Sequence, residues 1–489
     1  MKKKLGINAI ISLISQIVIS LFGLVIPRLV LLHYGSDVNG LTSTITQVFS
    51  YLALLEAGIS QAAKNALYPY IKDKENNVTN INHILSISKQ YYKKMTIIYG
   101  GIVLVLSIVL PFVIKTDVNW ITIFFLVIIE GFSGVVSFYF IQNWATILTV
   151  DGKTYFNSFS ELLNKSIFYI VKIVLVLFNV NIIFIQVGSI IGILIKLLLY
   201  YVYIKRNYSW VKYEKTSEKL KDRNSYIITE IAWTIFSSTD IIVLSLFCSA
   251  TLSSVYYVYS MIFNTLNLIL NTIYQSVVYK LCQDYFADID KYKITHDKFN
   301  IFFVSTINIL MCVGYILIIP FVKLYTAGVD DVNYIYEYIP IFFSVIQLLS
   351  WSRYVSGNLT GLSGYAKQTS YISLLEAILN IILSIILVNF YGIYGVLIAT
   401  VVALPLKVIF TNYISERKVL KRNPIRTITI YISNYIIFIA TIIINKFFLN
   451  LQIDNYISFI LYGIILTLIY TVIIYLINFL INIKILKKH

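Results

Sequence analysis

The chain has 489 residues, of which 58% are hydrophobic and only 13% are charged. Soluble domains carry about 25% charged residues, so this composition excludes an ordinary soluble domain and indicates an integral membrane protein. The formal net charge is +16, and the positions of the basic residues decide whether this charge implies an acidic partner.

Hydropathy predicts an all-α fold of about 14 transmembrane helices. The first apolar stretch is longer than the apolar region of a signal peptide and lacks a small-residue cleavage site, so we expect it to be retained as a span. The predicted spans are residues 7–32, 40–66, 96–114, 120–148, 155–178, 182–204, 225–247, 254–281, 300–321, 335–360, 368–389, 393–414, 429–449 and 456–482.

The connections between these spans alternate between nearly uncharged and strongly basic. Of the 39 Lys and Arg residues, 28 lie at the termini and in the even-numbered connections, three lie on the opposite side, and eight lie within spans. Cytoplasmic loops of membrane proteins are enriched in Lys and Arg. The distribution therefore predicts that both termini are cytoplasmic, and it accounts for most of the net charge without a nucleic-acid partner.

Two segments about 215 residues apart resemble one another. The matched positions are Asn143 with Asn358, Lys153 with Lys367, Glu161 with Glu376, and Asn164 with Asn380. This repeat predicts two six-helix lobes related by pseudo-two-fold symmetry, plus two C-terminal helices. The predicted parts are an N-terminal lobe (1–204), a basic cytoplasmic linker (205–224), a C-terminal lobe (225–414), and a cytoplasmic loop with the last two spans (415–489).

Residues 154–180 form the most unusual predicted span. Glu161, Lys165 and Lys172 interrupt an apolar run, and their spacings of four and seven place them on one helical face. A charge near the membrane centre costs about 2.5–3.5 kcal/mol on insertion scales, so this face should avoid lipid. Either Glu161 pairs with Lys165 while Lys172 extends to the membrane surface, or the face is a basic stripe lining a water-filled cavity.

Other polar residues within the predicted spans extend this picture. Arg353 lies deep in a predicted span, Arg28 lies near the outer end of the first span beside Pro27, and Glu56 and Asp240 are acids within spans. The predicted span 254–281 carries an amide stripe on one helical face, made of Asn264, Asn267, Asn271 and Gln275. Such residues either join neighbouring membrane helices by hydrogen bonds or line a cavity.

Motifs of the common enzyme classes are missing from the sequence. It contains no GxxxxGK[ST] phosphate loop, GxSxG nucleophile turn or HExxH zinc motif. The three cysteines and four histidines have no metal-ligand spacing. We therefore expect a transporter rather than an enzyme, with no cofactor and no metal site.

Four phrases of the sequence are similar to a known family. They are LLEAGISQAAKNALY (54–68), AWTIFSSTDIIVLSLF (232–247), VYYVYSMIF (255–263) and GYAKQTSYISLLEAILNIILSIILVNFYGIYGVLIATVVA (364–403). Their order and spacing resemble the polysaccharide (O-antigen or capsule repeat-unit) flippases of the multidrug/oligosaccharidyl-lipid/polysaccharide exporter superfamily. The resemblance implies a two-lobe alternating-access transporter in the bacterial cytoplasmic membrane, whose cargo is an oligosaccharide linked to polyprenyl pyrophosphate.

The resemblance and the residue pattern together predict a set of roles. We expect Arg28, Lys165, Lys172 and Arg353 to bind the anionic part of the cargo in a central basic cavity, and the Asn264–Gln275 stripe to bind sugar hydroxyls. Asp240 or Glu56 would couple transport to H⁺ or Na⁺, although pairing with a buried cation explains them equally well. Membrane lipids and a polysaccharide polymerase or other assembly protein are the further expected partners.

Two kinds of alternative remain at this stage. One is a different exporter of the same superfamily, either a lipid II flippase or a multidrug antiporter, although an exporter of cationic drugs would favour an acidic cavity. The other is a membrane scaffold for polysaccharide assembly that transports nothing and needs no charged residues facing a cavity.

Overall fold

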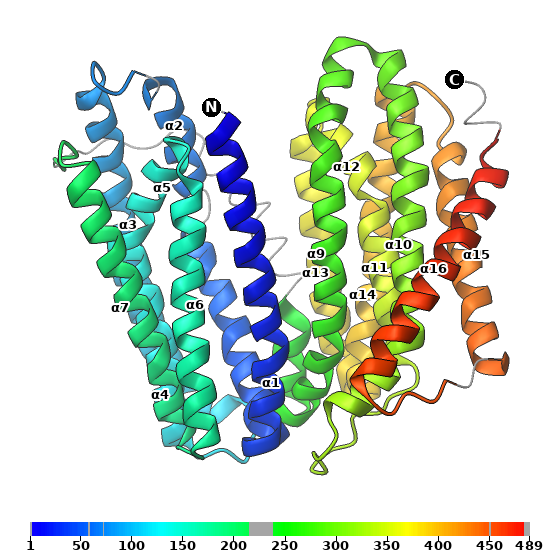
Figure 1. Cartoon of the computed structure of the whole chain (residues 1–489), viewed down its shortest axis with the longest axis horizontal. Helices are drawn as coiled ribbons and strands as arrows, with labels where there is room; N and C mark the ends of the chain where they lie inside the picture. Colours follow the sequence, from blue (N-terminus) through cyan, green and yellow to red (C-terminus); the bar gives the residue numbers. More distant parts are fainter. Residues whose placement is uncertain (1, 57–58, 72, 215–237, 449–450, 484–489) are drawn as a thin grey trace. The chain divides into compact units, whose positions relative to one another are not determined.

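The computed structural model describes residues 2–56, 59–71, 73–214, 238–448 and 451–483 (Figure 1). All regular elements of these residues are helices, which confirms the predicted all-α fold. Nine candidate spans within them are long and apolar enough to cross a membrane. The protein is thus a multi-pass membrane protein, and its chain divides into two compact units, Met1–Ser254 and Val255–His489.

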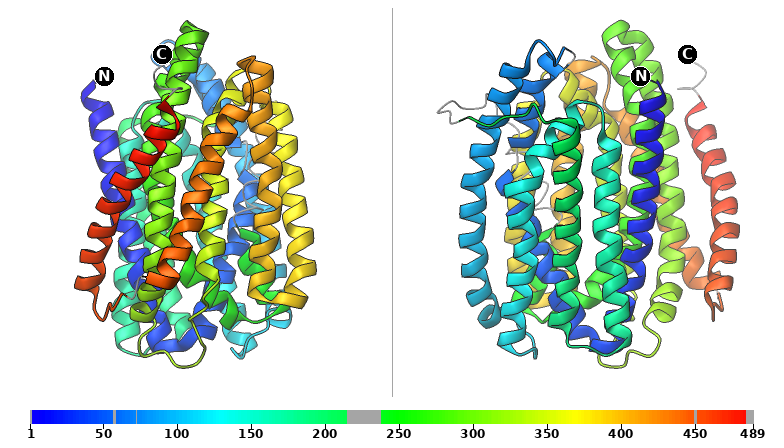
Figure 2. Two further views of the ribbon diagram at one scale, coloured as in Figure 1. Left: turned by 90° about the vertical axis from the view of Figure 1, so that its right-hand side faces the viewer. Right: turned by 60° about the vertical axis from the view of Figure 1, so that its left-hand side comes forward.

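Unit 1 consists of long helices with short interruptions. Its elements are α1 (Lys2–Leu52), a 3₁₀ turn (Ala53–Glu56), α2 (Ile59–Ile71), α3 (Val78–Val113), α4 (Trp120–Val136), a π-helical turn (Ser137–Ile141), α5 (Gln142–Val150), α6 (Thr154–Leu177), α7 (Ile182–Asn207) and the helix Ser238–Phe247. Figure 2 (right) shows α3, α4, α6, α7 and the first part of α1 running alongside one another.

Unit 2 begins early in α9 and ends with the C-terminal pair of helices. Its elements are α9 (Ala250–Ala287), α10 (Ile289–Tyr325), α11 (Ile339–Ser352), α12 (Tyr354–Leu362), α13 (Ala366–Tyr391), α14 (Ile393–Tyr413), a π-helical segment (Ile414–Val419), α15 (Ile425–Phe448) and α16 (Tyr456–Ile481). Figure 2 (left) shows the last two helices, in orange and red, along the side of this unit.

Several predicted spans differ from the helices in ways that have local causes. The first predicted span and the first part of the second (40–66) lie in the single element α1, which bends at Gly35, where a φ of 81° suits a residue without a Cβ; the rest of the second span is divided between the 3₁₀ turn and α2. The span 335–360 is two helices separated at Arg353. The predicted span 225–247 lies largely outside the described residues, and so does the boundary between the predicted lobes.

The helix Ser238–Phe247 and the residues after it pack on the second half of α1. A Cβ at Gly40 would lie 1.6 Å from the carbonyl oxygen of Ala250, so only glycine permits this approach. Hydroxyl and amide contacts follow the same line: Asn39 Nδ2 donates to Ser254 Oγ at 2.8 Å, Thr44 Oγ1 lies 2.6 Å from Ser245 Oγ, and Ser50 Oγ lies 2.7 Å from Ser238 Oγ. Residues 238–254 therefore belong to unit 1.

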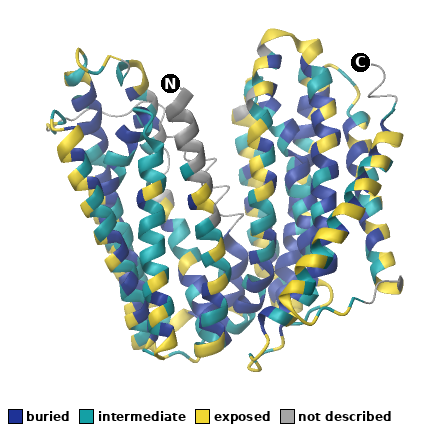
Figure 3. Ribbon diagram, viewed as in Figure 1, coloured by how far each residue is buried: buried dark blue, intermediate teal, exposed yellow. Residues whose placement is uncertain are grey.

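Helix α10 forms the core of unit 2. In its most apolar stretch 78% of the residues are buried, compared with 17% for α16 (Figure 3). Because α16 buries so little, specific polar contacts must hold the C-terminal pair in place. Asn434 of α15 accepts from Asn308 of α10 at 3.1 Å and exchanges two hydrogen bonds with Asn478 of α16, at 2.9 and 3.1 Å. All three amides are buried.

We predict that Asn434→Leu destabilises the protein by about 1–3 kcal/mol, because it leaves the buried amides of Asn308 and Asn478 with unmade hydrogen bonds. Thermal unfolding of the purified protein in detergent measures this effect. The matched control is Asn389→Leu, an exposed position on α13, which should leave the unfolding temperature unchanged. An equal effect of both substitutions would contradict this account of how α15 and α16 are attached.

Candidate functional site

Two helices that are long enough to cross a membrane are too polar to count among the nine candidate spans. They are α6, with 24 residues, and α9, with 38. At 1.5 Å per residue, even α6 is about 36 Å long, which exceeds the roughly 30 Å hydrocarbon core of a bilayer. These helices carry six of the ten predicted site residues.

The charged face of α6 is partly paired, but not in the way either interpretation of the sequence expected. Glu161 forms an ion pair with Lys196 of α7, with Nζ and Oε2 2.6 Å apart. Lys165 is half-buried and lies close enough for its charge to act on Glu161. The carboxylate of Glu161 therefore has Lys165 on its own helix and Lys196, its ion-pair partner, on the next. Spacing within one helix could not predict Lys196 as a partner.

Lys172 lies farther along the same face and does not extend to the membrane surface. Its side chain is only 8% exposed and its ammonium is 5.5 Å from the centre of the Phe168 ring. The nearest acid acting on it is Glu130 of α4, which accepts a hydrogen bond from Gln186 of α7. In the described part of the chain no carboxylate lies within 4 Å of Lys172, so its charge is incompletely compensated.

The cluster of charges on α4, α6 and α7 is therefore weakly basic. Three lysines of α6 and α7 (Lys165, Lys172 and Lys196) lie near two acids (Glu130 and Glu161). A nearby opposite charge lowers the free-energy cost of burying a charged side chain in a low-dielectric medium. A lysine in excess of the acids lacks this compensation, so an added anion would be attracted to it. This arrangement could hold a phosphate or another anionic group that approaches α6.

Unit 2 contains a similar cluster around the second repeat. Arg353 is 5% exposed at the turn between α11 and α12, and it pairs with the buried Glu376 of α13. Lys407 of α14 lies near both. The equivalent acids Glu161 and Glu376 thus each pair with a cation, but the cations come from non-equivalent positions. The pairing of Arg353 was not expected from the sequence, which treated this residue as free to bind cargo.

The predicted amide stripe on α9 is largely exposed. Asn264, Asn271 and Gln275 are exposed, whereas Asn267 is half-buried and accepts a hydrogen bond from Trp351 Nε1 at 2.7 Å. Asn267 therefore joins α9 to α11 within unit 2, and the other three amides lie on an open surface. Exposed amides are unfavourable against lipid tails, so this surface suits contact with water or with a polar cargo.

The three remaining predicted residues lie in unit 1 on elements other than α6. Arg28 is half-buried on α1 beside Pro27. Asp240 is buried in the helix Ser238–Phe247, and its neighbour Thr239 has its hydroxyl 2.5 Å from that of Tyr51. Glu56 is half-buried in the 3₁₀ turn after α1, near Tyr92 of α3. No group of three or more potential metal ligands occurs among the described residues.

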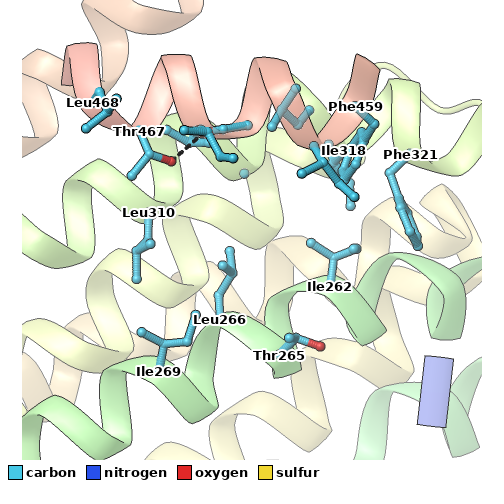
Figure 4. A pocket seen from close by; sticks show the side chains of 16 residues that line it. Ile262, Thr265, Leu266, Ile269, Leu310, Ile318, Phe321, Phe459, Thr467 and Leu468 are labelled. Carbon is cyan, nitrogen blue, oxygen red and sulfur yellow. Dashed lines mark hydrogen bonds between the residues drawn. The ribbon is translucent and has the colours of Figure 1, made fainter. Parts of the chain in front are cut away.

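An apolar groove in unit 2 was not found from the sequence. It has a volume of about 530 Å³ and lies between α9, α10 and α16 (Figure 4). Its two hydroxyl groups are satisfied by their own helices: Thr265 Oγ1 donates to Met261 O at 3.0 Å, and Thr467 Oγ1 donates to Gly463 O at 2.7 Å. Gly314 and Gly463 belong to its lining, and small residues there leave room for a ligand. Hydropathy could not reveal this groove, because every lining residue is also normal for a lipid-facing helix.

Comparisons with known proteins identify the class of fold. No family model matches the chain, and no curated protein matches its sequence. Among solved structures, the chain has the fold of helical membrane transporters that include members of the MOP superfamily.

Three of these structures illustrate the likeness. The lipid II flippase MurJ in an inward closed conformation has a TM-score of 0.68 and 17% identity, over 95% of this chain and 99% of that one. An inward-facing multidrug resistance MATE family transporter has a TM-score of 0.66 and 12% identity, over 86% and 95%. The MATE multidrug transporter DinF-BH has a TM-score of 0.61 and 16% identity, over 86% and 97%. At these identities the likeness establishes a common fold.

We predict that Arg353→Met destabilises the protein by about 3–5 kcal/mol, because it leaves the carboxylate of Glu376 buried without its partner. The double variant Arg353→Met/Glu376→Met removes both charges and should recover most of this loss. Thermal unfolding in detergent compares the two with Lys323→Met, which alters an exposed lysine. A single variant no less stable than the Lys323 control would show that the pair is not a structural requirement.

Proposed function

We propose that this protein is a flippase that moves oligosaccharides linked to polyprenyl pyrophosphate across the cytoplasmic membrane, for surface polysaccharide biosynthesis. The observation that carries this proposal is the coexistence, in one transporter fold, of a basic polar helix in unit 1 and a dry lipid-sized groove in unit 2. A cargo that is anionic, sugar-bearing and lipid-linked needs all of these surfaces.

The head of such a cargo requires cations and hydrogen-bonding groups. A pyrophosphate entering a low-dielectric region needs positive partners, which Lys supplies as a point charge and Arg as a bidentate donor. Lys165 and Lys172 provide the excess positive charge of the cluster on α4, α6 and α7, and Arg28 lies on the neighbouring helix α1. The exposed amides Asn264, Asn271 and Gln275 of α9 suit sugar hydroxyls. Since Arg353 pairs with Glu376, its role is to hold unit 2 together and to add to the local potential.

The lipid tail requires an apolar surface without polar groups that need hydrogen bonds from water. The groove between α9, α10 and α16 has a volume within the roughly 300–1,000 Å³ range of ligand sites, and it offers no unsatisfied polar group among its lining side chains. An isoprenoid or acyl chain can lie there while the head is held elsewhere on the protein. A water-soluble cationic drug has no use for either this groove or the basic residues of α6.

Lipid II is the strongest competing cargo, because it combines pyrophosphate, sugar and polyprenyl chain, and MurJ has the same fold. A scaffold that does not transport would need neither the incompletely compensated lysines of α6 nor the exposed amides of α9. Asp240 and Glu56 are our proposed sites of H⁺ or Na⁺ coupling, because both acids lie within unit 1. Both termini are expected on the cytoplasmic side, and the transported unit would supply a polysaccharide polymerase.

We predict that Lys165→Ala/Lys172→Ala abolishes translocation, because the cargo phosphates lose the excess positive charge of the cluster on α4, α6 and α7. Surface polysaccharide in cells, and flipping of defined lipid-linked glycans by purified protein in liposomes, measure this loss at unchanged protein level. The matched control is Lys298→Ala/Lys323→Ala, which removes two exposed lysines. Normal polymer from the first double variant would exclude this role, and activity on lipid II alone would identify the competing cargo.

We predict that Gly463→Phe slows flipping of a long-chain cargo several-fold, because the ring fills the groove. A Cβ at Gly463 lies 3.5 Å from Leu317 Cδ1, so a side chain fits there without a clash at its first atom. Flipping assays in liposomes should compare it with Gly101→Phe, placed on an exposed part of α3 with nothing within 4 Å of its Cβ. Equal rates for the two variants would show that the tail binds elsewhere.

A further inference from the structure

Unit 1 has an apolar groove of its own, smaller than that of unit 2, which we call the π-turn groove. It has a volume of about 290 Å³ and lies between α7 on one side and the π-helical turn with α5 on the other. Both walls belong to the same compact unit. The lining residues are all apolar or aromatic: Phe140, Trp144, Leu194, Leu197, Leu198 and Tyr201.

The π-helical turn shapes the first wall. The backbone N–H of Gln142 donates to the carbonyl of Ser137, five residues earlier, where an α-helix would use the fourth. Phe140 and Trp144 are four residues apart and therefore lie on one face of the helix that continues from this turn. The ring of Phe140 is exposed and contacts that of Tyr139 edge to face, with centres 4.5 Å apart. Such π turns inside helices occur frequently at functional sites.

Helix α7 supplies the second wall with a face that is directed away from α6. On its α6 side, a Cβ at Gly192 would lie 2.6 Å from Asn164 Oδ1, so the two helices are in close contact there. Leu194, Leu198 and Tyr201 lie on another face and are exposed. Their spacings of four and three give a continuous apolar stripe about 10 Å long. The π-turn groove is therefore open to the surroundings of the protein along this stripe.

Two basic residues lie at one end of this stripe. Lys205 and Arg206 belong to the last turn of α7, on the predicted cytoplasmic side, and both are exposed. The ammonium of Lys205 is 5.7 Å from the centre of the Tyr201 ring, so it lies at the end of the π-turn groove. The ion pairs in the described part of unit 1 join other lysines to Asp151 and Glu161. Lys205 and Arg206 therefore remain for an anion from outside the protein.

We propose that the π-turn groove binds one anionic phospholipid of the predicted cytoplasmic leaflet. An acyl chain lies along the groove, and the headgroup phosphate contacts Lys205 and Arg206. Such a lipid needs an apolar channel that runs along a helix and positive charges at the end of that channel, and both are present here. Basic sites beside transmembrane helices on the cytoplasmic side are typical binding places of anionic headgroups. The inference concerns unit 1 alone and does not depend on the cargo.

The direction in which the groove opens favours a phospholipid over the proposed cargo. The charges assigned to the cargo, Lys165 and Lys172, lie on α6. Lys196 of α7 reaches Glu161 of α6, and Leu198 follows it by two residues, which corresponds to about 200° around a helix. The π-turn groove therefore opens on the opposite side of α7 from α6. Ordinary phospholipids surround such a face, and cations at its end select the anionic ones among them.

Quenching of Trp144 by brominated lipids tests the proposal, because bromine atoms quench an indole only when they lie beside it. The full-length protein is placed in phosphatidylcholine nanodiscs that contain a small fraction of brominated phosphatidylglycerol or, in parallel, of phosphatidylcholine brominated at the same acyl position. The fluorescence lost in Trp144→Phe identifies the contribution of Trp144. We expect the anionic lipid to quench this contribution at least about fivefold more efficiently. Equal quenching by the two lipids would overturn the proposal.

Lys205→Ala/Arg206→Ala tests the headgroup contacts. The apolar groove remains in this variant, but the phosphate loses its cations, so the difference in quenching between the two lipids should disappear. The matched control is Arg417→Ala/Lys418→Ala, which removes two exposed basic residues from unit 2 and should retain the difference. A preference for phosphatidylglycerol that survives the first double variant would refute the role assigned to Lys205 and Arg206.

Competition with unbrominated lipids identifies the occupant. Added phosphatidylglycerol should relieve the quenching of Trp144 by its brominated form, whereas polyprenyl phosphate at the same mole fraction should not. Relief by polyprenyl phosphate as strong as that by phosphatidylglycerol would show that the groove accepts the chain of the proposed cargo, and would contradict its assignment to a phospholipid. None of these measurements requires translocation, so their outcome is separate from that of the flipping assays.

Discussion

A charge inside a membrane protein must be compensated by another charge, and this constraint organises both units. Glu161 and Glu376 occupy equivalent positions in the sequence repeat, and each has a cation beside it. The cations differ, however: Lys196 comes from the helix that follows Glu161, whereas Arg353 comes from a turn that precedes Glu376. The acid is the shared feature, and each unit compensates it with a different neighbour.

The same constraint separates structural charges from those available for binding. Arg353 stabilises the buried Glu376, so removing it should disturb the fold before it disturbs any ligand, and Lys196 partly neutralises Glu161. Lys165 and Lys172 leave the cluster on α4, α6 and α7 with more positive than negative charge. This residual charge is what our proposal of an anionic cargo depends on. The apolar groove of unit 2 adds the complementary property, because it can shelter a lipid chain from water.

The C-terminal helices are integral parts of unit 2 rather than appended anchors. Helix α15 contributes Asn434 to the buried amide cluster, Arg426 and Thr427 to the contacts of Asp297 and Glu416, and Tyr431 to the end of α11. Helix α16 forms one side of the groove. The pair therefore links the predicted cytoplasmic end of the unit to its membrane interior.

The sequence by itself determined the fold class, most of the helices and the polar character of α6 and α9. Membrane helices form their backbone hydrogen bonds within each helix, so a hydropathy profile predicts them without knowledge of their neighbours. Spacing along one helix likewise places Glu161, Lys165 and Lys172 on one face. Only the tertiary structure decided which partners those residues have. Lys196 and Glu130 come from other helices, the groove arises from three helices with ordinary apolar surfaces, and the pairing of Arg353 with Glu376 crosses 23 residues. These contacts depend on how helices rotate and pack, and periodicity within a single helix contains no information about its neighbours.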